Sequence, residues 1–173
     1  ISNRSSGGMG VLLAQAANFR GATVDLIHGP LQVSPALLDG LNLYPVRSAK
    51  QMQIELANLH ASADAIAMTA AVADLKKKGA IQQHKPTKES LIESLQNGLE
   101  TVPDLLAELV ANRTQKTKVI LGFAALSGND LEIKKLGEAK KNRKGCDLMM
   151  VNPIDRPGQG FEQNLNGGVL LGP

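Results

Sequence analysis

The chain has 173 residues, 43% of them hydrophobic and 20% charged, and a formal net charge of +3, which fits one globular domain and excludes a disordered polymer. No apolar stretch approaches the ~20 residues of a membrane-spanning helix, and the single cysteine, Cys146, excludes an intrachain disulfide and a cysteine-rich zinc site. Aromatic residues make up only 2%, too few to stack nucleic-acid bases, so we expect no membrane, no nucleic acid and a reducing, cytoplasmic environment.

The first third of the chain alternates helix-like and strand-like segments. A helix is predicted over 9–19, where apolar residues follow a helical period and Gly21 closes the last turn. Residues 23–27 (TVDLI) predict a strand, and 42–47 (NLYPVR) predict a weaker strand that its proline places at a sheet edge. A second helix is predicted to follow the N-cap residue Ser48.

The uncharged run 65–73 (AIAMTAAVA) shows no alternation of apolar and polar residues. It therefore predicts a strand that is covered on both faces, at the centre of the sheet, and that ends at Asp74. Residues 75–98 are poorly periodic and are expected to form a flap over the sheet edge. Pro103 and Asp104 then begin a short helix, because proline is favoured in the first helical turn.

The last third repeats this alternation. Residues 118–125 (KVILGFAA) predict a buried strand, 129–144 a basic helix, and 147–151 (DLMMV) and 169–171 two further strands, with a loop over 158–168. Strands that alternate with helices in this way are typical of βαβ units and of a mainly parallel sheet. The expected fold class is therefore α/β.

Polar residues come at the ends of three predicted strands, at Asp74, after Phe123 and at Asn152. The carboxyl ends of parallel strands meet at one edge of the sheet, where ligands of open α/β sheets bind. Residues 76–88 contain five lysines and no acid, and residues 134–144 contain six lysines and arginines and one acid, Glu138. Such local positive charge favours a phosphorylated small molecule as ligand, and solvated lysine faces are the alternative.

The opening segment ISNRSSGGMG puts serines and glycines directly before the first predicted helix. Glycine lets backbone amides approach a ligand, and a helix N-terminus offers unpaired N–H donors, so an anion-binding turn is one interpretation. A serine-capped helix behind a tight turn is the other. The glycine fingerprint of dinucleotide-binding folds, G-x-G-x-x-G, is absent from this segment.

Five short motifs occur in order along the chain. They are Asn-x-Ser-Ser-Gly-x-Met-Gly at 3–10, Ala-Ala-Val-Ala-Asp at 70–74, Gly-Phe-Ala-Ala at 122–125, Asp-Leu-(x)2-Val-Asn at 147–152 and Gly-Phe-(x)2-Asn at 160–164. Each is weak alone, but all five in order form a specific signal. Together they resemble the phosphopantothenoylcysteine synthetase domain, the ligase of coenzyme A biosynthesis that often follows a flavin-dependent decarboxylase in one bacterial polypeptide. The resemblance covers essentially the whole chain.

The resemblance implies one nucleotide-binding ligase domain over 1–173, with a three-layer Rossmann-like fold and a mainly parallel central sheet. The first strand of that fold is expected upstream of residue 1 and so to be missing here. The implied ligase joins 4′-phosphopantothenate and L-cysteine: the phosphopantothenate carboxylate attacks the α-phosphate of CTP to give an acyl-cytidylate and pyrophosphate, and the cysteine amine then displaces CMP. Mg²⁺ is expected on the triphosphate, FMN only in a fused decarboxylase domain, and the domain is expected to be a homodimer.

The resemblance also implies roles for individual residues. Asn3 matches a catalytic asparagine that supports the acyl-cytidylate and its turnover, and Lys85 matches a catalytic lysine that steadies charge on the α-phosphate. The residues expected to bind the nucleotide are Ser5, Met68, Thr69, Ala70, Asp74, Lys85, Val102, Pro103, Asp104, Phe123, Lys140 and Lys144, and those expected to bind the other substrates are Asn3, Ser6, Gly7 and Ala71. No protein metal ligand is expected. Capping a turn or packing in the core is the structural alternative at these positions.

Two other functions fit parts of the sequence. A nicotinamide-dependent dehydrogenase would share the glycine turn and the α/β alternation, but the only tyrosine, Tyr44, is followed four positions later by Ser48, so the Tyr-x-x-x-Lys pair of the short-chain class is not formed. A nucleotide-binding regulatory or degraded domain without turnover is the second alternative. The missing first strand favours it, as does Leu126, which stands where the family usually has glutamate or glutamine.

Overall fold

The glycine-rich turn leads into helix α1 (Gly8–Asn18), close to the predicted bounds. Gly7, the N-cap residue, has a left-handed φ of 77°, and a Cβ there would lie 2.3 Å from the Leu31 side chain. Glycine is therefore needed on both conformational and steric grounds. The helix ends just before Gly21, which is also left-handed, with φ 88°. The computed structural model describes residues 5–78, 98–156 and 167–173.

The next elements form a parallel pair of strands followed by a helix. Strands β1 (Asp25–His28) and β2 (Asn42–Pro45) pair in parallel, with the 3-10 turn η1 (Pro35–Leu38) between them. Helix α2 (Ala49–Leu59) follows, and the short turn η2 (His60–Ser62) ends it. The predicted cap is confirmed, because the Ser48 hydroxyl accepts a hydrogen bond from the Gln51 amide.

The remaining strands form a four-stranded sheet in the order β3-β6-β7-β8. Strands β3 (Ala65–Met68), β6 (Val119–Leu126) and β7 (Leu148–Pro153) are parallel, and β8 (Val169–Leu171) is antiparallel. Two helices cross over between them, α4 (Leu105–Ala111) and α5 (Asp130–Lys144). The mainly parallel α/β sheet predicted from the sequence is thus confirmed.

A small antiparallel pair extends from the end of β3. Its strands are β4 (Leu75–Lys77) and β5 (Leu99–Thr101). The pair falls in the segment where a flap is predicted, but most of that segment, 79–97, lies outside the described residues, so the flap stays a prediction.

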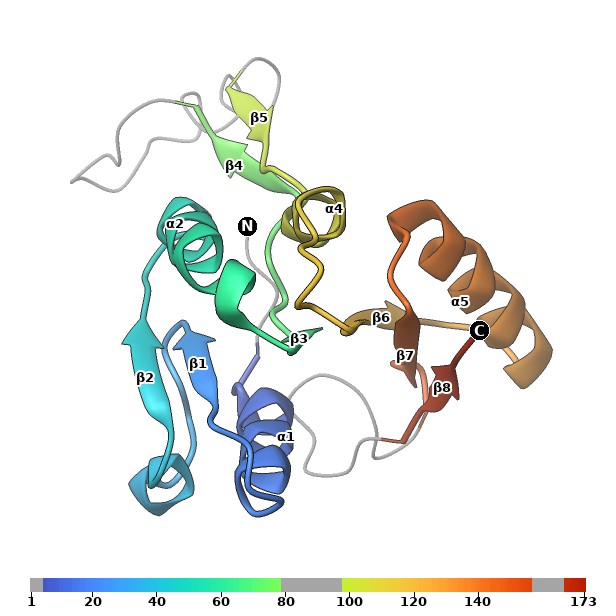
Figure 1. Ribbon diagram of the computed structural model, residues 1–173. Coiled ribbons are helices and arrows are strands. Elements are labelled where there is room, and N and C mark those ends of the chain that lie inside the picture. The colour runs from blue at the N-terminus through green and yellow to red at the C-terminus, as the bar shows by residue number, and fades with distance from the viewer. Residues whose placement is uncertain (1–4, 79–97, 157–166) are drawn as a thin grey trace.

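The elements make three layers, with α2, α4 and α5 on one side of the strands and α1 on the other (Figure 1). The main core lies under α5 and consists of Ile120, Ala124, Ile133, Cys146, Met149, Val151 and Leu171. A second cluster joins Val46, Met52 and Leu105, with Ile27 and Met68 packed against it. Because Ile27 belongs to β1 and Met68 to β3, this cluster connects the two groups of strands. None of the described helices is long and apolar enough to cross a membrane.

The prediction for 65–73 is wrong in three respects. Among the described strands, β3 lies at one end of the four-stranded sheet and not at its centre. The strand ends at Met68, and its residues alternate between exposed and half-buried instead of being covered on both faces. Ile66 and Met68 are half-buried, whereas Ala65 and Ala67 are exposed. Alanine is small and occurs on both buried and exposed faces, so a run of alternating alanines hides the period of a strand with one covered face.

Candidate functional site

The glycine turn and the end of β3 come together in the structure. The hydroxyl of Ser5 accepts a hydrogen bond from the Gly7 amide at 3.3 Å, and that of Ser6 from the Gly8 amide at 3.2 Å. A Cβ on Gly10 would lie 2.7 Å from the hydroxyl oxygen of Thr69. The first turn of α1 can therefore approach the strand end closely only because residue 10 is glycine.

The end of β3 also lies beside the middle of β6. Met68 is the register partner of Gly122, so Phe123, the next residue of β6, stands at the level where β3 stops. Phe123 is half-buried, and Ala70 and Ala71 are exposed. The structure thus brings three predicted segments, the glycine turn, the end of β3 and the Gly-Phe motif, to one place at the carboxyl edge of the sheet.

A set of charged side chains gathers where β5 leads into α4. The amide of Val102 donates to the carbonyl oxygen of Asp74 at 2.9 Å, which joins the two chain segments. Asp104 caps α4, since its carboxylate accepts from the Ala107 amide at 3.2 Å, and its second oxygen pairs with the ammonium of Lys144 on α5. Pro103 is exposed beside this pair.

The ion pair determines the charge state of Asp104. Burial by itself would raise the pKa of this carboxyl, but the hydrogen bonds from Lys144 and from the Ala107 amide outweigh burial and hold the pKa below its usual range. Asp104 is therefore ionised at neutral pH and is engaged with both α4 and α5.

Lys140 lies one helical turn before Lys144 on the same face of α5. Its pKa is lowered by partial burial first and then by the nearby cations Lys144 and Arg143, whereas the carboxylates of Asp74 and Asp104 act in the opposite direction. These five residues form what we call the charged cluster. Within the described parts of the chain, Lys140 makes no ion pair, so it offers an ammonium to an incoming anion.

Arg143 belongs to this cluster but is not among the predicted site residues. It lies three residues after Lys140 and one before Lys144, and it influences the pKa values of both Lys140 and Asp104. The i, i+3, i+4 spacing of these cations on one helix was the signal in the sequence that could have identified it.

The two predicted catalytic residues, Asn3 and Lys85, lie outside the described residues. Their roles stay predictions. The other predicted residues are described, and they form the two neighbouring groups above: the glycine turn with the ends of β3 and β6, and the charged cluster.

The carboxylates of the site suit a Mg²⁺ ion that is bound mainly by the substrate. No group of three or more histidine, cysteine or acidic side chains in the described segments could hold a metal ion. Asp104 is occupied by Lys144, whereas Asp74 is exposed. This donor set fits a Mg²⁺ ion that is held mainly by phosphate oxygens of a substrate, with Asp74 as the available carboxylate.

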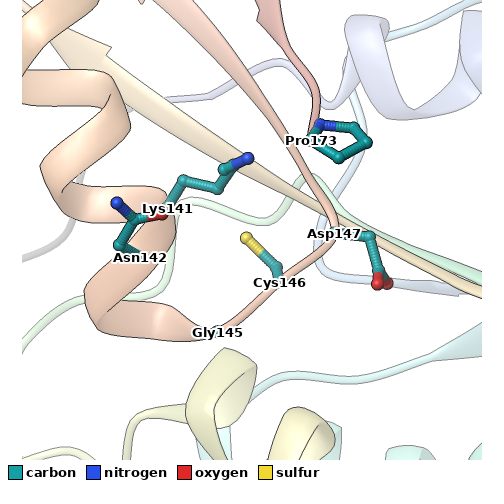
Figure 2. A pocket seen from close by; sticks show the side chains of 6 residues that line it. All are labelled: Lys141, Asn142, Gly145, Cys146, Asp147 and Pro173. Atoms are coloured by element: carbon teal, nitrogen blue, oxygen red, sulfur yellow. The ribbon is translucent and has the colours of Figure 1, made fainter.

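A separate hollow of about 370 Å³ lies at the opposite edge of the sheet, where β7 begins. Figure 2 shows residues that line it: Lys141 and Asn142 belong to the end of α5, and Cys146 and Asp147 to the segment just before β7. Burial raises the pKa of the Cys146 thiol, and Cys146 belongs to the main core. The cysteine is therefore a small residue of the core.

Comparison with known proteins places the chain in a family. The family described as the DNA/pantothenate metabolism flavoprotein C-terminal domain matches residues 1–173. The chain belongs to this family. The family membership inferred from the five motifs is confirmed, and the glycine turn and the charged cluster are features of this chain within it.

Individual relatives agree with the assignment. The chain is 37% identical over 187 residues to the coenzyme A biosynthesis bifunctional protein CoaBC of Mycobacterium tuberculosis, covering 99% of this chain and 41% of the relative. It is 35% identical over 173 residues to the protein of the same name from Vibrio parahaemolyticus, covering 100% and 42%. This chain thus spans less than half the length of either relative.

Solved structures show the same fold. The crystal structure of the C-terminal domain of a CoaBC protein superposes with a TM-score of 0.65 at 27% identity, over 86% of this chain and 65% of that one. The Rossmann-like α/β fold expected of a member of this family is therefore the fold of this chain.

Proposed function

We propose that this domain is the ligase that joins 4′-phosphopantothenate and L-cysteine in coenzyme A biosynthesis, with CTP as the activating nucleotide and an acyl-cytidylate as the intermediate. The relatives that match the whole chain carry the name of a bifunctional protein of that pathway, and the domain that superposes on it comes from such a protein.

One observation carries the proposal most directly: α5 brings Lys140, Arg143 and Lys144 together near Asp74, a few residues after the end of β3. Formation of an acyl-cytidylate needs no protein nucleophile. It needs a nucleotide held in position and positive charge near its phosphates, because negative charge develops there as the bond to pyrophosphate breaks.

Each group of residues has its own task in this proposal. The glycine turn, with Ser6, Gly7 and Ala71, positions the phosphopantothenate, and the end of β3 with Phe123 holds the nucleoside. Lys140 attracts the phosphates from the half-buried face of α5. When bound, Mg²⁺ would neutralise charge on the triphosphate, with Asp74 as the available protein carboxylate.

Asn3 and Lys85 are proposed to carry the two chemical steps. A lysine ammonium at the α-phosphate favours attack by the carboxylate, and a neutral amide can donate to the acyl oxygen without binding the substrate carboxylate permanently. We further propose a homodimer in the cytoplasm, with FMN confined to a fused decarboxylase domain.

The experiment that tests the activity measures release of pyrophosphate by the longest natural form of the protein, with CTP and then with ATP. We expect release that depends on phosphopantothenate and is faster with CTP. Release that does not depend on phosphopantothenate, or no release with either nucleotide, would contradict the ligase.

The two steps can be separated with two variants. We expect Lys85→Ala to abolish acyl-cytidylate formation, and Asn3→Ala to allow the intermediate to form but to slow its capture by cysteine, by on the order of a hundredfold for loss of one oxyanion donor. Quenched-flow sampling of the intermediate measures both. An equal loss of both steps in the Asn3 variant would refute this division of roles.

A second function remains in competition, a nucleotide-binding domain without turnover. Leu126 favours it, because this half-buried side chain stands at the end of β6 where a polar residue is usual in the family. Such a domain would bind CTP with ordinary affinity and release no pyrophosphate, so the same assay distinguishes the two.

A further inference from the structure

Asp104 is the one residue of the charged cluster that is fixed on both sides. One carboxylate oxygen accepts from the Ala107 amide at 3.2 Å, and the other pairs with the Lys144 ammonium. The side chain of Lys144 is 20% exposed and that of Asp104 is 46% exposed. The pair is therefore partly shielded from water, and its geometry is set by the cap of α4.

The two lysines of α5 consequently differ in availability. Lys144 already has a carboxylate partner, whereas Lys140, one turn earlier, has none within the described residues. An anion that uses both lysines must compete with Asp104 for the second one. While Asp104 keeps its charge, it also repels that anion.

We propose that Asp104 is a specificity-determining residue that makes the site reject bare phosphoanions. Inorganic pyrophosphate can displace the Asp104 carboxylate from Lys144. The displaced carboxylate then lies beside an anion that offers it no hydrogen-bond donor. A nucleoside triphosphate brings hydroxyl and amine donors that can satisfy the displaced carboxylate. Discrimination then arises from an unpaired charge in the unwanted complex, a recognised way to obtain specificity.

This proposal rests on the proposed function only where it concerns the binding of CTP. Binding of pyrophosphate can be measured without any turnover. The informative variant is Asp104→Asn. Asparagine is as good an N-cap as aspartate, so α4 keeps its cap while the charge is removed. The matched control is Asp64→Asn, which removes the same charge from an exposed aspartate that pairs with Lys116 at 3.8 Å.

Calorimetric titration of the chain with pyrophosphate is the first measurement. We expect Asp104→Asn to bind pyrophosphate about three- to tenfold more tightly than the unaltered chain, the size expected for removal of one like charge a few ångström away in a partly water-exposed site, and Asp64→Asn to bind it unchanged. Affinity for CTP should rise less than affinity for pyrophosphate. Weaker or unchanged pyrophosphate binding by Asp104→Asn, or no binding by any of the three proteins, would overturn the proposal.

A double-mutant cycle with Lys144→Gln distinguishes competition from a general effect of charge. If Asp104 occupies Lys144, replacing this lysine should cost little pyrophosphate affinity in the unaltered chain and at least threefold more in the Asp104→Asn background. An equal cost in both backgrounds would show that Asp104 does not compete for Lys144, and would overturn the proposal. Thermal unfolding of each variant verifies that the comparison is between folded proteins.

If the pyrophosphate results hold and no ligation is found, the proposed function fails and the role of Asp104 stands. If ligation is found and pyrophosphate binds equally to all variants, the role of Asp104 fails and the proposed function stands.

Discussion

Single side chains at the amino edge of the sheet show how local contacts hold the strands in place. Asp147 accepts hydrogen bonds from the Ile120 amide at 2.7 Å and from the Arg113 guanidinium at 2.9 Å. Arg113 also donates to the carbonyl oxygens of Thr117 and Lys118. One carboxylate thus joins β6, β7 and the turn that follows α4.

Replacement of this carboxylate should have a pH-dependent cost. Burial alone would raise the pKa of Asp147, but the hydrogen bonds from Arg113 and Ile120 prevail and lower it. Because the pKa is lower in the folded chain than in the unfolded one, the contact stabilises the fold at neutral pH, and this stability is lost as the pH falls below about 4 towards the folded-state pKa.

We therefore expect Asp147→Asn to lower the free energy of unfolding by about 1 kcal/mol at pH 7, and by less at pH 3. Urea unfolding at both pH values measures it. A loss of the same size at pH 3 and pH 7 would show that the charge of Asp147 is not what matters.

At the scale of elements, α5 is the helix that carries the cations of the site, and its position has two causes. Its N-terminus has a full capping box: the Asn129 side chain accepts a hydrogen bond from the backbone N–H of Glu132, and the Glu132 side chain accepts one from the backbone N–H of Asn129. Near its middle, Gly137 lies against the sheet so closely that a Cβ would be 2.6 Å from Val151 and 2.8 Å from Leu171. The helix can approach β7 and β8 only with glycine at this position.

Loss of the cap should destabilise the helix without altering the charges at its other end. We expect Asn129→Ala to lower the free energy of unfolding by about 1 kcal/mol, with little change in pyrophosphate affinity. The exposed Asn142 lies on the same helix, so Asn142→Ala is the matched control. An equal loss of stability in both variants would contradict the role of the cap.

At the scale of the whole molecule, the two groups of strands are connected by side chains and not by backbone pairing. The described residues place no strand between β1 and β3, although the cluster of Val46, Met52 and Leu105 packs against both groups. The carbonyl of Asp64 accepts from the Lys118 amide. Backbone N–H and C=O groups of successive residues point to opposite sides of a strand. Those of Ile66 and Met68 therefore also point toward β6, whereas those of Ala65 and Ala67 point away from it.

Amide exchange should reveal this open edge. We expect the amides of Ala65 and Ala67 to exchange at least about tenfold faster than those of Ile66 and Met68. All four residues lie in register with β6, but only the amides of Ile66 and Met68 point toward it. Hydrogen exchange followed by NMR measures each amide separately. Equal protection along β3 would mean that another segment of the chain covers that edge.

The sequence by itself determined the features that depend on near neighbours. The caps at Ser48 and Asn129, the glycine that closes α1 and the buried strand KVILGFAA all follow from residues within a few positions of one another. Five motifs in order also identified the family. Caps, turns and strands can be predicted from the sequence because they are set by local backbone geometry.

Only the tertiary structure decided which distant residues meet. The pairing of Asp104 with Lys144 spans 40 residues, and the contact of Gly10 with Thr69 joins the first helix to the end of β3. The short, half-exposed form of β3 was also hidden in an apolar run. These features depend on how closely helices pack on the sheet, and close packing is set by side-chain volumes from several elements together, which no local pattern in the sequence records.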